Sequence, residues 1–136
     1  MTAERSAVNT YTVRSTSGAE LRIGALGTEG AFSPVELLQA ALAGCAALSA
    51  EAQLTSQLGP NFDATSAVTA MFNAEENRVE TLITTIAADS SELSSEKHDK
   101  LVASAQRIID KLCTVKRSLS AGVEPVSAVT SLESVV

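Results

Sequence analysis

The sequence predicts an α+β domain, because two long helical segments alternate with short β-prone segments that come in neighbouring pairs. Residues 9–14 and 20–25 form the first pair, separated by a Ser-rich turn that ends in Gly18. Residues 65–73 and 78–88 form the second pair, joined by a polar turn. Both pairs are expected to be antiparallel. Their order along the chain favours an α+β domain over a parallel α/β sheet.

The first long helix is expected from about Ser33 to Leu58. Ser33 is a typical N-cap, Pro34 suits the first helical position, and Glu36 stands three residues after the cap, which together make a capping box. Gly59, followed by proline, ends the helix. This interpretation makes Glu36 a structural cap.

The second long helix is expected over residues 94–112, where apolar residues recur at helical spacing on one face and charged residues occupy the other. The apolar positions are Leu101, Ala105, Ile108 and Leu112. A short helix is expected over 114–119, and a final strand from about 123 to 132. The predicted order is therefore β-β-α-β-β-α-α-β.

Length and composition describe one globular domain spanning residues 1–136. The net charge of −6 and the pI of about 4.7 argue against nucleic acid or an anionic membrane as partner. The N-terminus shows no signal-peptide core, and the longest apolar run, 37–48, is too short to span a bilayer. We expect a cytoplasmic protein. One histidine, His98, lies in a charged segment, so no metal site and no cofactor are predicted.

Cys45 lies on the first long helix, in the apolar stripe that contains Leu38. Free cysteine often packs as a small hydrophobic residue, so a purely structural role is one interpretation. The small neighbours Gly44 and Ala46 favour a functional role instead, because they leave room beside the sulfur for a ligand or another backbone. Glu36 lies nine residues away, on the opposite side of the helix, and is not expected to assist Cys45.

Cys113, the second cysteine, stands 68 positions after Cys45, where the second long helix ends and the short helix begins. Lys116 and Arg117 follow at the next helical turn, and both cations and a helix N-terminus stabilise a thiolate. A buried structural cysteine at a helix joint is an equally good interpretation. In the cytoplasm a bond between the two cysteines would be transient.

The segment SPVELLQAALAGCAAL, the second cysteine in KLCTVKRSL and the predicted order of elements together resemble the OsmC/Ohr family of osmotically inducible and organic hydroperoxide resistance proteins. The resemblance extends from about Tyr11 to Leu132. It implies an OsmC-like fold with antiparallel sheets around a long cysteine-bearing helix. It also implies an intertwined homodimer with its active sites at the subunit interface.

The resemblance further implies a thiol-dependent peroxidase that reduces organic hydroperoxides in oxidative stress defence. In that cycle Cys45 is the peroxidatic and Cys113 the resolving residue, and an external dithiol, such as a lipoyl protein, resets the pair. Two alternatives stay open. One is a non-catalytic OsmC-fold protein that binds an apolar small molecule or lipid near Cys45, and the other is a thiol stress sensor.

Two positions, Val35 and Thr114, depart from the pattern of the best-known members of that family. Val35 stands where those members carry a glutamate that holds a catalytic arginine. Arg14 and Arg22 are the candidates for this arginine, and a solvated strand residue is an equally good interpretation of each. Thr114 follows the second cysteine where relatives often have proline. These departures suit a divergent OsmC-like member with weaker or differently directed peroxidase activity.

Overall fold

The computed structural model describes residues 1–134 and confirms the α+β class. The elements in chain order are β1 (Thr2–Ala7), β2 (Thr10–Arg14), β3 (Glu20–Gly24), α1 (Pro34–Leu58), β4 (Ala64–Asn73), β5 (Arg78–Ala88), α2 (Ser95–Leu112), α3 (Thr114–Ala121) and a 3₁₀ turn (Leu132–Ser134). One antiparallel sheet has the order β1-β2-β3, and a second consists of β4 and β5. Both hairpins and all three helices lie where the sequence predicts them.

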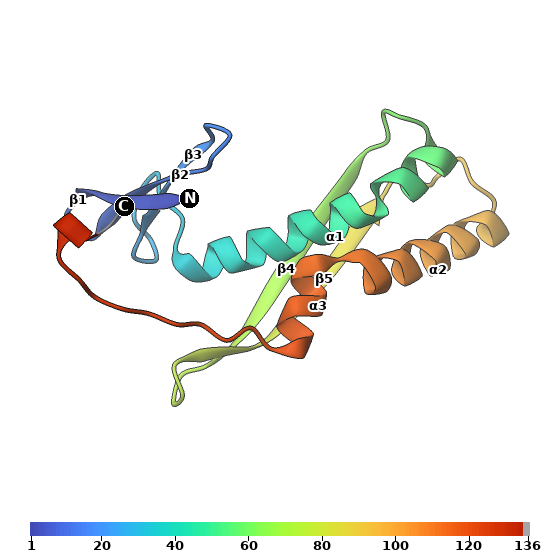
Figure 1. The fold of residues 1–136 in the computed structure, drawn as a ribbon. Helices are drawn as coiled ribbons and strands as arrows, with labels where there is room; N and C mark the ends of the chain where they lie inside the picture. The colour runs from blue at the N-terminus through green and yellow to red at the C-terminus, as the bar shows by residue number, and fades with distance from the viewer. Residues whose placement is uncertain (135–136) are drawn as a thin grey trace.

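Helix α1 is the centre of the fold (Figure 1). Its capping box is present: the Glu36 N–H donates to Ser33 Oγ at 3.2 Å, and the Ser33 N–H donates to Glu36 Oε1 at 3.1 Å. Hydrogen bonds from the Ser33 hydroxyl and from its backbone N–H lower the pKa of Glu36, so its carboxylate is engaged at the helix start, as the sequence predicts. Four residues at a spacing of four make its buried stripe: Leu42, Ala46, Ala50 and Leu54.

Helix α2 and the β4–β5 hairpin both pack against α1. Ala50 and Leu54 of α1 meet Leu101 of α2 in one core cluster, which Ile109 extends toward a second cluster built on Leu42, Ala46 and Cys113. The alanines let the two helices approach closely. This packing explains why α1 is apolar along most of its length.

Side-chain hydrogen bonds fix the position of α1 on both neighbours. Gln39 donates to the carbonyl of Val68 at 3.1 Å, and Ser66 donates to the carbonyl of Ala43 at 2.9 Å, so β4 is tied to the first half of the helix. Gln53 donates to Ser104 of α2 at 2.9 Å, which ties α2 to the second half. The two halves are thereby held in one register relative to the hairpin and to α2.

Helix α1 is also the one helix in residues 1–134 that is long and apolar enough to cross a membrane by length and composition. The apolar run 37–48, which Gln39 interrupts and from which the sequence predicts no span, is only part of this helix of 25 residues. The central helix of a packed domain meets the same two criteria, and α1 lies against α2 and the β4–β5 hairpin. Its composition is therefore weak support for a membrane span.

Two terminal segments correct the predicted order of elements. β1 was not expected, because all six of its side chains are exposed and its sequence carries no apolar alternation. The predicted final strand over 123–132 is wrong, because residues 123–131 form no regular structure. The Val and Ser residues there suit a strand, but no strand of the described chain pairs with them, and Pro125 lacks an N–H donor. Figure 1 shows this segment extending from α3 toward the N-terminal sheet.

Candidate functional site: two thiols at a helix joint

The α2–α3 joint places Cys113 inside the fold. Cys113 ends α2 and begins α3: its N–H donates to the carbonyl of Ile109 at 2.9 Å, and its own carbonyl accepts from the N–H of Arg117 at 3.0 Å. Its backbone is extended, with φ −66° and ψ 100°, so the chain turns sharply between the helices. The side chain is 0% exposed and belongs to the cluster with Leu42 and Ala46.

Cys45 reaches the same cluster from α1. It lies beside Ala46 in the helix, is half-buried, and packs against Cys113, and both cysteines are free thiols. Two residues 68 positions apart in the sequence are thus brought together by the packing of α3 on α1. Cys45 is partly exposed, and Cys113 is enclosed.

The N-terminus of α3 lowers the pKa of the Cys45 thiol. The largest cause is the backbone N–H of Val115, followed by the hydrogen bond with the Cys113 thiol, and the N–H of Thr114 and the hydroxyl of Ser49 act in the same direction. Burial opposes these bonds, but the net shift is downward. Unpaired N–H groups and the positive end of a helix stabilise a thiolate, so Cys45 is the more acidic sulfur.

Burial raises the pKa of Cys113, and the neighbouring Cys45 adds to the rise, although the Lys116 N–H and the Ser49 hydroxyl oppose it. The sequence suggested instead that the side chains of Lys116 and Arg117 would stabilise a Cys113 thiolate. That expectation is wrong, because the Lys116 ammonium pairs with Asp110 and the Arg117 guanidinium donates to the carbonyl of Lys111 at 3.2 Å. The helix N-terminus acts on Cys45 instead.

Ser49 is a site residue that the sequence did not predict. Its hydroxyl donates to the carbonyl of Cys45 at 2.7 Å and acts to lower the pKa of both thiols. The signal was present, since a residue four positions after Cys45 lies one helical turn above it. Nothing in the sequence showed that α3 would bring Cys113 to the same turn.

Neither candidate arginine lies at the thiols in the described chain. Arg14 pairs with Glu20 at 2.7 Å and with Glu4 at 3.3 Å within the N-terminal sheet. Residues 1–134 give Arg22 no ion pair or hydrogen bond to Cys45, and the β1–β3 sheet lies beyond the start of α1 (Figure 1). Val35, at the helix start, is 38% exposed. Neither Arg14 nor Arg22 is among the groups that lower the pKa of Cys45.

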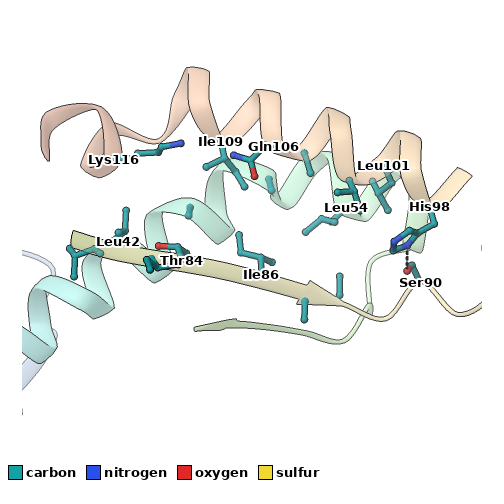
Figure 2. Close-up of a pocket in the computed structure, with 18 residues that line it drawn as sticks. Leu42, Leu54, Thr84, Ile86, Ser90, His98, Leu101, Gln106, Ile109 and Lys116 are labelled. Atoms are coloured by element: carbon teal, nitrogen blue, oxygen red, sulfur yellow. Dashed lines mark hydrogen bonds between the residues drawn. The ribbon is translucent and has the colours of Figure 1, made fainter. Parts of the chain in front are cut away.

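A groove of about 580 Å³ runs between β5, α1 and α2 on the side of the core next to the thiols. Figure 2 shows Leu54, Ile86 and Leu101 directed into it, and Lys116 of α3 at the end opposite His98. At the His98 end, its Nδ1 lies 2.7 Å from Ser90 Oγ. Neither cysteine lines the groove, although Leu42 and Ala46, their neighbours in the core, do.

The described residues contain no group of three or more His, Cys, Asp or Glu side chains that could hold a metal ion. The site is therefore a pair of thiols with one hydroxyl and the N–H groups of a helix start. A half-buried thiol of lowered pKa lies beside an enclosed thiol of raised pKa, and the thiolate is the reactive form of cysteine.

Comparison with known proteins identifies the family to which this thiol-bearing α+β domain belongs. The family model for OsmC-like proteins matches residues 27–126, which include both cysteines, and the chain belongs to this family. Uncharacterized proteins of Mycobacterium tuberculosis and Mycobacterium bovis are 31% identical over 119 residues, covering 88% of this chain and 87% of each relative.

Two solved structures share the fold. A proposed osmotic stress induced and detoxification response protein from Psychrobacter arcticus 273-4 has a TM-score of 0.63 at 22% identity, covering 86% of this chain and 85% of that one. The organic hydroperoxide resistance protein OhrB of Bacillus subtilis has a TM-score of 0.53 at 21% identity, covering 87% and 90%. The predicted OsmC-like membership is thus confirmed, and identities at this level carry the fold alone.

Proposed function

We propose that the protein is a thiol-dependent peroxidase that reduces organic hydroperoxides through Cys45 and Cys113. The observation that carries the proposal is the placement of the half-buried Cys45 thiol against both the N–H groups of α3 and the enclosed Cys113 thiol. The N–H groups lower the pKa of Cys45 without help from an arginine. This accounts for an acidic sulfur in a chain that has Val35 in place of the glutamate expected from the resemblance.

The proposed cycle has three steps. The Cys45 thiolate attacks the terminal oxygen of the peroxide, the O–O bond breaks, and the alcohol leaves, so that Cys45 becomes a sulfenic acid. The Cys113 sulfur then attacks the sulfenic sulfur, forming a disulfide and releasing water. An external dithiol, such as a lipoyl protein, reduces the disulfide and returns both thiols.

The test is to treat the reduced protein with one equivalent of an alkyl hydroperoxide and to map its thiols by mass spectrometry. We expect a Cys45–Cys113 disulfide in the wild type. Cys113→Ser should stop at the Cys45 sulfenic acid, and Cys45→Ser should react no faster than a free thiol. A wild-type protein whose two thiols stay reduced, or whose cysteines become oxidised independently, would overturn the two-thiol mechanism.

A homodimer is the second part of the proposal, and the surface area of the single chain supports it. The chain exposes 10114 Å². A compact monomer of 14.0 kDa exposes about 6,700 Å² by the usual scaling of area with mass. The excess of about 3,400 Å² per chain would give an interface of about 6,800 Å² counted over two chains, at the upper end of obligate homodimers, whose interfaces run from about 2,000 Å² to above 5,000 Å².

Helix α1 shows where a second copy would pack. Ala41, Gly44 and Leu48 form an apolar stripe on its exposed face, and Leu48 is 75% exposed. A Cβ added at Gly44 would meet no atom within 4 Å. Small residues at this spacing let another helix approach closely, and the groove beside α1 provides further apolar surface for the same copy to cover.

Native mass spectrometry and sedimentation of Gly44→Arg test the dimer. In an isolated chain this change is harmless, because the site is open and arginine favours a helix more than glycine does. We therefore expect the variant to be a folded monomer, and Gln57→Arg, an exposed position on the same helix, to stay dimeric. A wild-type monomer, or a dimeric Gly44→Arg, would contradict the proposal.

The same mass spectra decide the alternative that the protein binds an apolar molecule. A dimer of twice the chain mass supports the proposal, whereas a constant additional mass, together with no peroxide turnover, would favour a non-catalytic carrier that uses the groove. A thiol stress sensor would instead form the disulfide with peroxide but show no turnover when a dithiol is supplied. The cytoplasmic location remains a prediction, as does the absence of nucleic acid and membrane partners.

A further inference from the structure

We infer that the C-terminal segment of one chain, residues 123–133, fills the groove between β5, α1 and α2 of a second copy. The inference rests on the proposed homodimer and names the part of the partner that covers this groove. In a single chain the large apolar side chains of the segment are exposed, and so is Val102 in the wall of the groove. Each therefore offers the apolar surface that the other needs.

The segment carries a large apolar side chain at every third residue. These side chains are between 64% and 103% exposed and form an apolar ridge: Val123, Val126, Val129 and Leu132. An extended chain of the polyproline type has three residues per turn, so this spacing places all four on one face. Pro125 favours that conformation, and residues 123–131 form no helix or strand that would prevent it.

The groove has a length that suits one extended segment. It follows α2 from His98 to Ile109, about 17 Å at 1.5 Å per residue, and continues to Lys116 of α3 (Figure 2). From Glu124 to Glu133 the segment spans about 28 Å at about 3.1 Å per residue. One segment is therefore long enough to occupy the groove from end to end.

A polar atom in the groove favours a peptide over a hydrocarbon as the occupant. Thr84 lines the groove, and its Oγ1 is the one buried side-chain nitrogen or oxygen in residues 1–134 that has no hydrogen-bond partner. Buried polar atoms are normally paired. An extended segment has N–H and C=O groups that make no bonds within the segment, so it can supply a partner. A hydrocarbon chain has no such group.

The charges of the segment and the groove are complementary. The described residues that line the groove include no aspartate or glutamate, and Lys116 and His98 stand at its opposite ends. The segment carries Glu124 near its start and Glu133 at its end, and no lysine or arginine. Lys116 already pairs with Asp110, but an ammonium has three donors and can bond a second carboxylate. Because each chain has a net charge of −6, a contact that joins carboxylates to cations is favoured over others.

The direction of the segment indicates that it fills the groove of the partner. It leaves α3 toward the N-terminal sheet, whereas the groove runs from α3 toward the start of α2, the opposite way (Figure 1). A two-fold axis perpendicular to α1 at Gly44 reverses directions along that helix. This axis passes near both copies of α3, since α3 packs beside Cys45. Each segment then runs from Lys116 of the partner subunit toward His98 of the partner subunit.

The experiment measures the dissociation constant of the dimer by sedimentation. Val126→Ser combined with Val129→Ser removes the middle of the apolar ridge, and both side chains are exposed in the single chain, so the fold is kept. We expect dissociation at least about 100-fold easier, because burial of one valine is worth about tenfold or more and a dimer has two segments. Ser127→Asn combined with Thr130→Asn changes polar positions beside the ridge. This matched control should alter the constant by no more than about threefold.

A variant of the groove tests whether the segment is its occupant. Val102 lines the groove and is 54% exposed, so Val102→Ser leaves the single chain folded. It should weaken the wild-type dimer about tenfold, but the dimer without the two ridge valines by less than about threefold, since a contact already lost is not lost again. Equal weakening of both dimers would separate the segment from the groove and overturn the inference.

Cross-linking identifies the chain from which the segment comes. Carbodiimide treatment of a dimer of isotopically heavy and light chains should join Glu124 of one chain to Lys116 of the other. Cross-links confined to one chain would place the segment in its own groove. A constant additional mass in native mass spectra would place a small molecule in the groove. Either result would refute the inference.

Failure of the inference is distinguishable from failure of the proposed homodimer. A wild type that is monomeric at every concentration would contradict both. If the wild type is a dimer and the ridge variant dissociates like the Ser127 and Thr130 control, the homodimer stands and only the role of the segment is refuted.

Discussion

Replacing Thr114 with proline tests whether the start of α3 sets the acidity of Cys45. Thr114 is the first residue of α3, and its backbone N–H is one of the groups that lower the pKa of the Cys45 thiol. Proline has no N–H but fits the first position of a helix. The preceding residue, Cys113, already has an extended backbone with ψ 100°, which a following proline requires. Thr114→Pro therefore removes one hydrogen bond to the sulfur and leaves the helix in place.

The size of the effect follows from the worth of one such bond. A hydrogen bond contributes about 0.5–1.5 kcal/mol net, and about 1.4 kcal/mol is a factor of ten in an equilibrium constant. We expect the acid dissociation constant of Cys45 to fall about 2- to 12-fold. The N–H of Val115 and the Cys113 thiol precede that of Thr114 among the causes, so the thiol remains more acidic than an ordinary cysteine. Stability should change by less than about 1 kcal/mol, because the restriction of the unfolded chain by proline, worth about 0.4–1 kcal/mol, opposes the loss of the hydrogen bond.

The assay is the rate of alkylation of Cys45 by iodoacetamide as a function of pH, with urea unfolding measured in parallel. Thr114→Ala is the matched control, because it removes the hydroxyl and keeps the N–H. We expect the control to follow the wild-type pH profile and Thr114→Pro to need a higher pH for the same rate. A Thr114→Pro profile that coincides with both others, in a protein of unchanged fold, would refute the role of the helix start.

Three further predictions concern the core, the cap and the thiols. Leu54→Ala should lower the free energy of unfolding by about 2–5 kcal/mol in a urea titration, because Leu54 is 6% exposed in the α1–α2 cluster. Leu48→Ala should lower it only at protein concentrations at which the wild type is a dimer, because Leu48 is exposed in the single chain. Ser33→Ala should cost about 1 kcal/mol in the same urea titration, since both bonds of the capping box involve Ser33; an unchanged midpoint would contradict the cap. One equivalent of iodoacetamide near neutral pH should label Cys45, whose pKa is lowered, and leave the enclosed Cys113, whose pKa is raised, until urea is added. Peptide mapping that finds Cys113 labelled first in the folded protein would reverse the assignment of the two thiols.

The elements with local signals could be predicted from the sequence. The capping box at Ser33, the glycine after Leu58 and the turn before Glu20 each act within a few residues, so their physics is visible in a short segment. β1 could not be predicted because its side chains are exposed, so burial leaves no apolar pattern that indicates a strand. Residues 123–131 are the opposite case: their Val and Ser residues favour a strand, but no strand of the described chain pairs with them.

The site was predictable only in part. Cys45 and Cys113 were named on the strength of a family resemblance, because spacing along the chain says nothing about contact between residues 68 positions apart. The sequence places the N-terminus of the short helix at Cys113, but the first N–H groups of a helix have no partner within the helix and bond to a group beyond its N-terminal end. For α3 that group is the Cys45 thiol. Only the packing of α3 on α1 brings Cys45 there.

The position of Cys113 at the joint between α2 and α3 has a consequence for the lifetime of the protein in the cell. A bond from Cys113 to Cys45 would close a loop that contains the β4–β5 hairpin and α2. Closing a loop of about 70 residues removes enough freedom from the unfolded chain to stabilise the fold by about 4 kcal/mol in the chain-entropy model. The reduced form, which unfolds more readily, would then be the preferred substrate of cellular proteases. A chain caught in the oxidised state would survive longest, so oxidising conditions would raise the amount of the protein without any new synthesis.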